Sequence, residues 1–359
     1  MSVREQQILA LLRDDPMISQ AEIADKLGLS RSGVAGHIMN LTNKGIIKGR
    51  GYVFDDAPFA VVIGGANIDI LGIPARALVL HDSNPGIVHT SPGGVARNIA
   101  ENLARLGSDC RLISAVGNDH YGDLILRQGR AAGIDMQHVA QLNTAQTSTY
   151  MSVLNKSGEM YVALSDMSVI AAVDVNYLRE HETLLKQAAL IVADTNLTDD
   201  SLAWLTTTFR ESALFIDTVS TTKARKIRPY LINVHTLKPS LIEAEALSGI
   251  DAGNREHLPK MAQWFHDQGV TRVFITLGAE GVYFSTGSAR GTDNLKMKTK
   301  KIDNAGGAGD AFMAGLAHAW LQDWNLQKTL RFSLSAAQSA LSNPDNINPA
   351  LSVEAMVQA

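Results

Sequence analysis

From about Pro58 onward, short apolar runs typical of buried strands alternate with helical stretches, which limits the possible folds more than any other feature of this 359-residue chain. Strands that are apolar on both faces need helices on both sides, which indicates a largely parallel sheet in an α/β fold. The expected strands are 59–65, 111–116, 189–193, 213–217, 234–237, 272–277 and 282–285. The expected helices between them include 95–106, 121–132, 201–208 and 258–267.

Two segments, 70–90 and 147–165, do not follow this alternation. Both mix β-forming residues with polar ones, a composition that suits a half-exposed sheet rather than a buried strand. We therefore expect these two segments to form a small second sheet, a lid on the main one.

The first part of the chain has a different pattern, with three short helical stretches at 4–13, 21–27 and 30–44. A β-prone stretch around a glycine-rich turn follows at 46–54, and three helices followed by a hairpin are the layout of a winged helix-turn-helix. The acidic pair Asp55-Asp56 and Pro58 mark a break in the chain. The sequence thus predicts a domain at 1–56 and a larger one at 57–359.

The stretch 26–50 carries five basic residues and no Asp or Glu, in a chain whose net charge is −4. A basic stripe on a helix-turn-helix is typical of DNA binding, with the third helix in the major groove. The residues expected to reach DNA are Arg31, Ser32, His37 and Asn40 on that helix and Lys48 and Arg50 on the wing. The alternative is a helical docking module that binds no DNA.

The amino-acid composition and the lack of several motifs exclude further classes of protein. A single cysteine, Cys110, excludes an intrachain disulfide framework and a cysteine-rich zinc site. We see no apolar run of 18 residues, no signal-peptide pattern, no P-loop and no Gly-x-Gly-x-x-Gly after a strand. The expectation is a cytoplasmic protein that does not enter a membrane.

The most informative motif is the glycine-rich loop 304–312, which leads directly into a helix. Free N–H groups at a helix start form an anion site, and small residues let the backbone approach a ligand closely. Asp310 would repel a bound phosphate, so its place there suits a base that accepts a proton from an attacking hydroxyl. The alternative is a glycine-rich turn in which Asp310 only caps the helix.

A second glycine pair, Gly93-Gly94, opens another helix, with Asn98 one turn further on. An amide side chain can both donate to and accept from a sugar hydroxyl. Asn67 and Asp69 are expected to end the first strand, at the carboxyl edge where ligands bind in open α/β sheets. Asp69 could accept hydrogen bonds from a diol there.

Together these motifs resemble the ribokinase-like (PfkB) carbohydrate kinase family over nearly all of 59–345. Gly93, Gly94 and Asn98 match its Gly-Gly-x-x-x-Asn signature, and 307–310 match Gly-Ala-Gly-Asp, whereas 304–306 and Ser240 depart from the family pattern. The resemblance implies a three-layer α/β/α sandwich with a small β-sheet lid. It also implies ATP and Mg²⁺ as cofactors, with Glu243 near the metal and K⁺ as a candidate third.

The same resemblance implies a role for each matching residue. Asp310 would accept the proton of the acceptor hydroxyl, and the amides of Gly307, Ala308 and Gly309 would neutralise the transferring phosphoryl group. The expected substrate contacts are Asn67, Asp69, Ser83, Asn84, Gly93, Gly94, Asn98, Thr149 and Asp166. The expected ATP contacts are Lys238, Thr276, Gly278, Gly281, Gly306 and Asn343.

Within the family, several segments are similar to those of bacterial pseudouridine kinases, namely 65–69, 82–86, 147–150, 157–160, 192–194 and 235–239. This resemblance implies transfer of the ATP γ-phosphate to the 5′-hydroxyl of pseudouridine, and the family's paired lids imply a homodimer. Three alternatives stay open: another nucleoside such as inosine, a simple sugar, or a transcriptional regulator whose kinase-like domain senses a nucleoside without turning it over.

Overall fold

The computed structural model describes residues 1–48, 57–293, 306–343 and 345–357, which divide into two compact units, Met1–Ala57 and Pro58–Ala359. Most of the expected wing, including Arg50, lies outside the described residues, as do Asn304 and Ala305.

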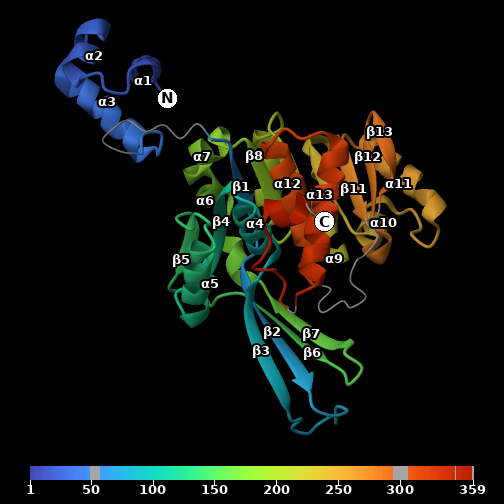
Figure 1. Ribbon diagram of the computed structural model, residues 1–359. Helices are drawn as coiled ribbons and strands as arrows, with labels where there is room; N and C mark the ends of the chain where they lie inside the picture. The colour runs from blue at the N-terminus through green and yellow to red at the C-terminus, as the bar shows by residue number, and fades with distance from the viewer. Residues whose placement is uncertain (49–56, 294–305, 344, 358–359) are drawn as a thin grey trace. The chain divides into compact units, whose positions relative to one another are not determined.

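The first unit consists of α1 (Val3–Asp14), α2 (Gln20–Leu27) and α3 (Arg31–Asn43) (Figure 1). A serine precedes each helix, and its hydroxyl accepts a backbone N–H of the first turn, which fixes where the helix begins. Gly28, with φ of 63°, ends α2. Apolar side chains from the three helices form a separate small core that includes Ile8, Ile23 and Leu41. The three predicted helices are therefore present.

The second unit contains a nine-stranded sheet of order β13-β12-β11-β10-β9-β8-β1-β4-β5. Neighbouring strands from β11 to β5 run parallel, whereas β12 and β13 are antiparallel. The strands are β1 (Phe59–Ile63), β4 (Asp109–Gly117), β5 (Val139–Leu142), β8 (Leu190–Asp194), β9 (Leu214–Asp217), β10 (Thr236–Lys238), β11 (Arg272–Thr276), β12 (Val282–Thr286) and β13 (Ala289–Asp293). All seven predicted strands occur, and the two edge strands β5 and β13 were not predicted because they are partly exposed and form no apolar run.

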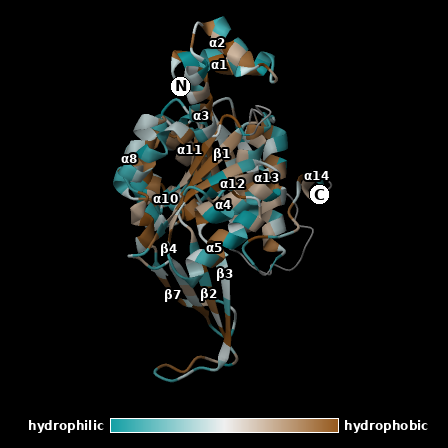
Figure 2. Cartoon of the chain, turned by 90° about the vertical axis from the view of Figure 1, so that its left-hand side faces the viewer, coloured by the Kyte–Doolittle hydropathy of each residue, from teal (hydrophilic) through white to brown (hydrophobic). Residues whose placement is uncertain are grey.

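Helices cover both faces of this sheet, and each face has its own apolar core. One core includes side chains of α4 (Val95–Arg105), α5 (His120–Ala131), α12 (Ala308–Leu321) and α13 (Leu326–Leu341). The other includes side chains of α6 (Val175–Glu180), α7 (Glu182–Gln187), α8 (Asp199–Thr208), α9 (Thr221–Ala224), α10 (Leu241–Ser248) and α11 (Leu258–Asp267). Figure 2 shows the apolar strands between these more hydrophilic helices. The predicted three-layer α/β/α sandwich is confirmed.

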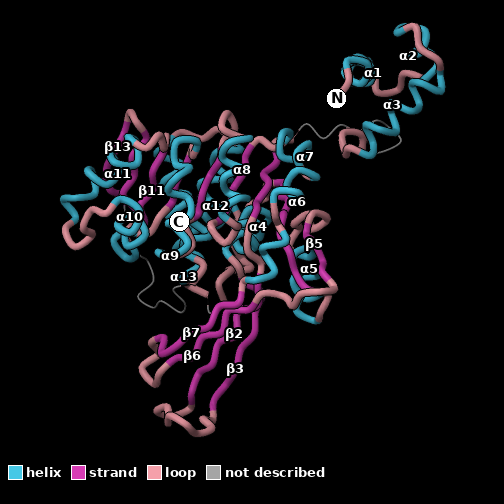
Figure 3. The backbone as a smooth tube through the Cα atoms, turned by 180° about the vertical axis from the view of Figure 1, so that it is seen from behind, coloured by secondary structure: helices cyan, strands magenta, loops and turns pink. Residues whose placement is uncertain are grey.

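A second sheet, the lid, projects from one end of the main sheet (Figures 1 and 3). It has the order β3-β2-β6-β7, made of β2 (Asn67–Pro74), β3 (Gly86–Gly93), β6 (Thr149–Leu154) and β7 (Met160–Asp166). These strands come from the two segments that interrupt the strand–helix alternation. One placement was wrong: Asn67 and Asp69 do not end the first strand, because β1 stops at Ile63 and both residues belong to the start of β2.

Within the described ranges, none of the helices combines the length and the apolar character that crossing a membrane requires.

Candidate active site

Four neighbouring strands of the main sheet end in polar residues at the same edge. Asp194, Asp217 and Lys238 end β8, β9 and β10 and are paired in register, and Thr276 ends β11 beside them. Carboxyl ends of parallel strands form the usual ligand-binding edge of an open α/β sheet. The lid and the first turn of α12 meet the same region, so this edge is the candidate active site.

The carboxylate of Asp194 joins three segments that are distant in the sequence. Its Oδ2 accepts the backbone N–H of Gly65 at 2.9 Å and of Ala96 at 3.0 Å, and its Oδ1 accepts that of Asn196 at 2.8 Å. Asp194 is completely buried. The turn after β1 and the start of α4 are thus fixed to the end of β8, and with them the residues that those segments carry.

Asp310 lies on the first turn of α12 and is buried against α4. The Asn98 amide Nδ2 donates to Asp310 Oδ2 at 2.9 Å, while Arg97 Nη1 donates to Asn98 Oδ1 at 3.1 Å. Because the guanidinium can only donate, it fixes the orientation of the amide and directs its N–H groups toward Asp310. The two glycine-rich helix starts are therefore in direct contact.

The surroundings of Asp310 favour its protonated form more than water would. Burial, followed by the negative charge of Asp217, raises the pKa of Asp310 to about 7, against the hydrogen bond from Asn98 and the charge of Lys238. A carboxyl group that titrates near neutrality can accept a proton from an alcohol and release it again.

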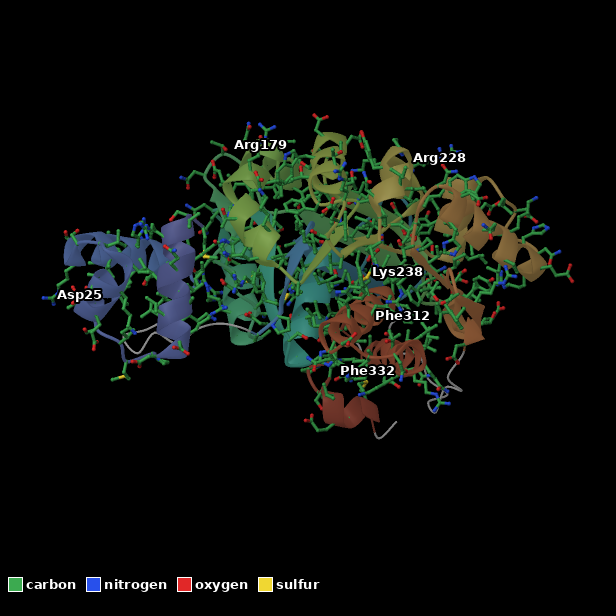
Figure 4. The ribbon with its side chains drawn as sticks, turned by 90° about the horizontal axis from the view of Figure 1, so that it is seen from above. Asp25, Arg179, Arg228, Lys238, Phe312 and Phe332 are labelled. Atoms are coloured by element: carbon green, nitrogen blue, oxygen red, sulfur yellow. The ribbon has the colours of Figure 1, made fainter. Side chains whose placement is uncertain are left out.

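Lys238 is the cation of the site. Its Nζ lies 3.0 Å from Asp217 Oδ2, with both side chains nearly inaccessible. Burial alone would lower its pKa, but the charges of Asp217, Glu243 and Asp310 outweigh burial and raise the pKa of Lys238. Figure 4 shows Lys238 in the interior of the unit. The ammonium is therefore charged and held where an anionic ligand would arrive.

The start of α12 requires glycine at Gly307, and at Gly309 a side chain would crowd Lys238. Gly307 has φ of 74°, and a Cβ there would lie 2.0 Å from the carbonyl oxygen of Asn346. A Cβ on Gly309 would lie 3.2 Å from Lys238 Nζ. The first N–H groups of a helix have no acceptor within the helix, so this end of α12 offers donors beside the Lys238 ammonium. Gly306, described directly before it, belongs to the same turn.

Asp69 is held by two amides, Asn67 Nδ2 on its Oδ1 and Asn346 Nδ2 on its Oδ2, each at 2.7 Å. A Cβ on Gly93 would lie 2.1 Å from Asp69 Oδ2, so only glycine fits opposite this carboxylate. Burial raises the pKa of Asp69. Because each oxygen can accept a further hydrogen bond, the carboxylate can still bind two adjacent hydroxyls.

Oxygen atoms suited to Mg²⁺ surround Glu243. Its Oε2 accepts the Thr218 hydroxyl at 2.6 Å and the Ser240 backbone N–H at 2.8 Å. Ser240 Oγ is buried without a hydrogen-bond partner in the described chain, and Asp217 Oδ2 lies nearby in the ion pair with Lys238. No described cluster of three His, Cys, Asp or Glu side chains could hold a metal. Mg²⁺ usually keeps several waters and binds through one or two carboxylates and phosphates, which this partial oxygen set fits.

The residues predicted to contact ATP divide into two groups. Thr276 ends β11, and its backbone N–H bonds to the Pro239 carbonyl beside the end of β10, while Gly278 and Gly281 lie in the loop that follows. Asn343 donates its amide to the Ile347 carbonyl at 2.8 Å, within its own turn. The first group lies at the ligand edge, whereas the side chain of Asn343 stabilises the turn that carries Asn346.

The structure does not bring four predicted substrate residues to Asp69. The side chain of Asn84 bonds to the backbone of Val79 and Asp82 in the loop that also carries Ser83, at the far end of β2. That end is about 17 Å along the strand from Asp69. Thr149 and Asp166 pair in the row of buried Ile68, so their side chains leave the lid on the face opposite to Asp69.

The strand register places further residues on the Asp69 face of the lid that the motifs did not indicate. Ser91, Tyr150 and Ser165 share the row of Asp69 and therefore its face of the lid. Asn346, Asp194 and Asp217 were also missed. A strand that ends in Asp was the available signal for the last two, but nothing in the sequence pairs Asp194 with the start of α4 or Asn346 with Asp69.

In the first unit, Arg31, Ser32 and Asn40 of α3 are exposed, His37 is half-buried, and Lys48 is exposed beyond the helix. The opposite face of α3 is buried by Val34, Ile38 and Leu41. The charge of Lys44 is compensated, because its Nζ lies 3.0 Å from Glu5 Oε2 of α1. The exposed part of α3 also includes Met39, and the sequence has no acidic residue between Lys26 and Lys48.

Comparison with known proteins gives matches for both units. The pfkB family carbohydrate kinase model matches residues 57–352, and a winged helix-turn-helix DNA-binding model matches residues 1–48. The pseudouridine kinase of Escherichia coli K12 is 41% identical over 295 residues, covering 82% of this chain and 94% of that protein. The uncharacterized sugar kinase YeiI of the same strain is 38% identical over 354 residues, covering 99% of this chain and 98% of that protein.

Among solved structures, a putative ribokinase II from E. coli in complex with ATP and Mg²⁺ superposes with a TM-score of 0.72 at 17% identity. The match covers 84% of this chain and 99% of that one. At this identity the likeness shows the fold.

We expect Gly307→Ala to destabilise the second unit far more than Gly249→Ala, which has the same φ of 74° but open space around its Cβ. The left-handed conformation alone costs about 1–2 kcal/mol for alanine. The contact with the Asn346 carbonyl should add about 1–3 kcal/mol at Gly307 only. Free energies of unfolding from denaturant titrations would test this, and equal losses in the two variants would contradict it.

Proposed function

We propose, since this chain belongs to the pfkB family of carbohydrate kinases and is therefore a phosphotransferase with a hydroxyl acceptor, that it phosphorylates the 5′-hydroxyl of pseudouridine with ATP. It is a nucleoside or sugar kinase by family, and both the family and the winged helix-turn-helix expected from the sequence are confirmed. The similarity to a pseudouridine kinase over 94% of that protein's length supports the nucleoside.

One observation supports the reaction more than any other, namely the Asp310 carboxylate, which is buried beside Asn98 on the first turn of α12. In phosphoryl transfer the protein mainly positions the reactants and neutralises charge, with one carboxylate directing the nucleophile. In our proposal Asp310 takes the proton of the 5′-hydroxyl. The amides of Gly307, Ala308 and Gly309 then stabilise the charge on the transferring group.

The ribose would be held by Asp69 and Asn67 from the lid and by the backbone at Gly93-Gly94, with Asn98 between the sugar and Asp310. These groups come from segments that Asp194 fixes to the main sheet. We place the ATP phosphates between the start of α12 and Lys238, beside the loop with Thr276, Gly278 and Gly281. The cation and the helix N-terminus both attract the phosphates there.

We propose Mg²⁺ as the metal, in line with the ATP and Mg²⁺ bound by the ribokinase-fold protein from E. coli. Glu243, Asp217 and Ser240 would hold it, mostly through water, because only a partial set of oxygens faces that position. When bound, Mg²⁺ neutralises charge on the ATP phosphates. K⁺ as a third cofactor and a cytoplasmic location stay predictions.

The rival function is a regulator that binds a nucleoside without phosphorylating it. The departures at Ser240 and at 304–306 allow it, and the contact between Asn98 and Asp310 favours catalysis instead. The substrate also has rivals within the reaction, since inosine, uridine or a simple sugar would present a comparable primary alcohol.

A coupled assay of ATP consumption with pseudouridine, uridine, inosine and ribose tests the proposal directly. We expect pseudouridine to give the highest kcat/KM, and Asp310→Asn to lower kcat at least a hundredfold while the Kd for ATP stays close to wild type. Asp345→Asn is a control, because Asp345 is exposed. Turnover of none of the four, with pseudouridine binding intact, would favour the sensor.

The pH profile gives a separate test of Asp310. The base must be deprotonated, so kcat/KM should fall about tenfold per unit below a pKa of about 7, rather than below the ordinary carboxyl value of about 4. Asp217→Asn removes a negative charge that raises this pKa, so the acid limb should move to lower pH. A limb that stays in place or moves upward in Asp217→Asn would contradict the assignment.

For the first unit we propose DNA binding through α3, with 1–56 as the DNA-binding domain and control of the chain's own substrate genes as its use. A winged helix-turn-helix match and the exposed Arg31, Ser32 and Asn40 support it. We also propose a homodimer formed through the lid face opposite to Asp69. Val88, Met151, Val162 and Leu164 are exposed on that face. Sedimentation of Leu164→Glu, expected to be monomeric, tests the dimer.

We expect Arg31→Ala to weaken binding to duplex DNA and to reduce the slope of log Kd against log salt by about 1, because one phosphate contact is lost. Fluorescence anisotropy between 50 and 200 mM salt measures both quantities. The matched control is Arg4→Ala on α1, whose guanidinium already donates to Gln7 at 2.9 Å. An unchanged slope in Arg31→Ala would contradict the proposed groove contact.

A further inference from the structure

A cavity of about 260 Å³ lies at the edge of the main sheet opposite to the active site. Its walls come from the first residues of β10 and β11, from β9, and from the end of α12 and the turn that joins it to α13. Lys238, by contrast, is the last residue of β10. The cavity and the candidate active site thus lie at opposite ends of the strands, and the cavity is no part of the candidate active site.

Arg272, the first residue of β11, brings a guanidinium to this cavity. None of the described residues accepts a hydrogen bond from this side chain, and no described carboxylate lies within ion-pair distance of it. Among the described side chains, the guanidinium faces the ring of Phe274, with its central carbon 5.6 Å from the ring centroid. Arg272 is half-buried, and burial lowers its pKa without any compensating negative charge. A cation held partly out of water without a partner costs free energy that a bound anion would offset.

The neighbouring histidine does not supply the missing charge. His235 lies next to Arg272 across the β10–β11 edge, and burial, followed by the charge of Arg272, lowers the pKa of His235 to about 4. Its ring is therefore neutral at physiological pH, and it stacks on Phe215 at 5.6 Å with an interplanar angle of 7°.

Half of the remaining lining is aromatic, and the other half consists of Thr236, Leu316, Thr329 and Asp323, whose carboxylate forms no ion pair with Arg272. Phe215, Phe274, Trp320 and Trp324 contribute rings to the wall, and Trp320 contacts Phe215 and His235 edge-on at 5.8 and 4.7 Å. Trp320 is still 36% exposed, so part of its surface is available. Edge and face contacts of this kind favour a flat ring as the occupant.

We propose that this cavity binds a small aromatic carboxylate, whose ring contacts Trp320 and Phe274 and whose negative charge pairs with Arg272. A volume of about 260 Å³ is below the usual range of about 300–1,000 Å³ for ligand pockets, so one ring with one anionic group fits and a nucleotide does not. The fork of the guanidinium matches a carboxylate with two parallel hydrogen bonds.

Benzoate and its neutral analogue benzamide, tested on the full chain by saturation-transfer NMR and calorimetry, separate charge from shape. We expect benzoate to bind saturably and benzamide at least tenfold more weakly. Saturating ATP should leave the benzoate signal unchanged. Equal binding of the two compounds, no saturable binding of benzoate up to 10 mM, or displacement of benzoate by ATP would overturn the proposal.

Arg272→Met should weaken benzoate binding at least tenfold. The matched control is Arg228→Met, because the Arg228 guanidinium also lies 5.6 Å from an aromatic centroid, that of Trp264, but at the outer edge of the molecule (Figure 4). Benzoate affinity in this control should equal that of wild type. Unchanged affinity in Arg272→Met, or equal losses in both variants, would count against the site.

The thermal midpoint distinguishes a ligand-binding arginine from a structural one. Because Arg272 has no hydrogen-bond or ion-pair partner to lose among the described residues, we expect the midpoint of Arg272→Met to be equal to or above that of wild type. If the midpoint of Arg272→Met falls by more than about 5 °C, the benzoate affinity of a second variant, Arg272→Lys, decides between the two roles. This variant keeps the charge without the fork, so its benzoate affinity should fall several-fold at an unchanged midpoint. Wild-type affinity in Arg272→Lys would refute the paired carboxylate.

Discussion

The site depends on one buried carboxylate whose structural role none of the motifs predicted. Asp194 accepts N–H groups from the turn after β1, from the start of α4 and from its own loop. A Cβ at Gly64 would lie 2.3 Å from its carboxyl carbon, so the turn passes directly over it. A buried charge is tolerated only when it is hydrogen-bonded, and here those bonds also determine where Asn67 and Asn98 are placed.

The charges around Asp310 also follow from the way in which neighbouring strands end side by side. Asp217 and Lys238 are adjacent in register and form a buried ion pair, with Asp310 of α12 close enough to interact with both charges. Asp217 raises the affinity of Asp310 for a proton, whereas Lys238 lowers it. A carboxylate with only the lysine nearby would be a weak base, and one with only the aspartate would be protonated at neutral pH. The ion pair keeps Asp310 between these limits.

Local patterns predicted the parts of this structure that local physics determines. Apolar runs predicted seven strands of the main sheet, helical spacing the three N-terminal helices, and the two glycine pairs both helix starts of the site. The predictions that failed concern residues whose surroundings depend on strand pairing or on contacts between distant parts of the chain. Thr149 and Asp166 seemed suitable by composition, but the register turns their side chains away from Asp69, because a shift of one residue reverses the face. Asn346 reaches Asp69 from 277 positions away, and no local signal encodes that.

The helix α12 connects the two edges of the sheet. It begins at the anion-binding turn before Asp310 and carries Trp320 ten residues later, about 15 Å along the helix axis. Gly315 lies midway, and a Cβ there would meet the Ser333 backbone of α13 at 2.6 Å, so the two helices touch without intervening side chains. Such close backbone packing leaves little room for one helix to slide or bend independently of the other. The hairpin of α12 and α13 therefore behaves as one rigid piece, and the position of Asp310 at one end is tied to the packing around Trp320 and Trp324 at the other.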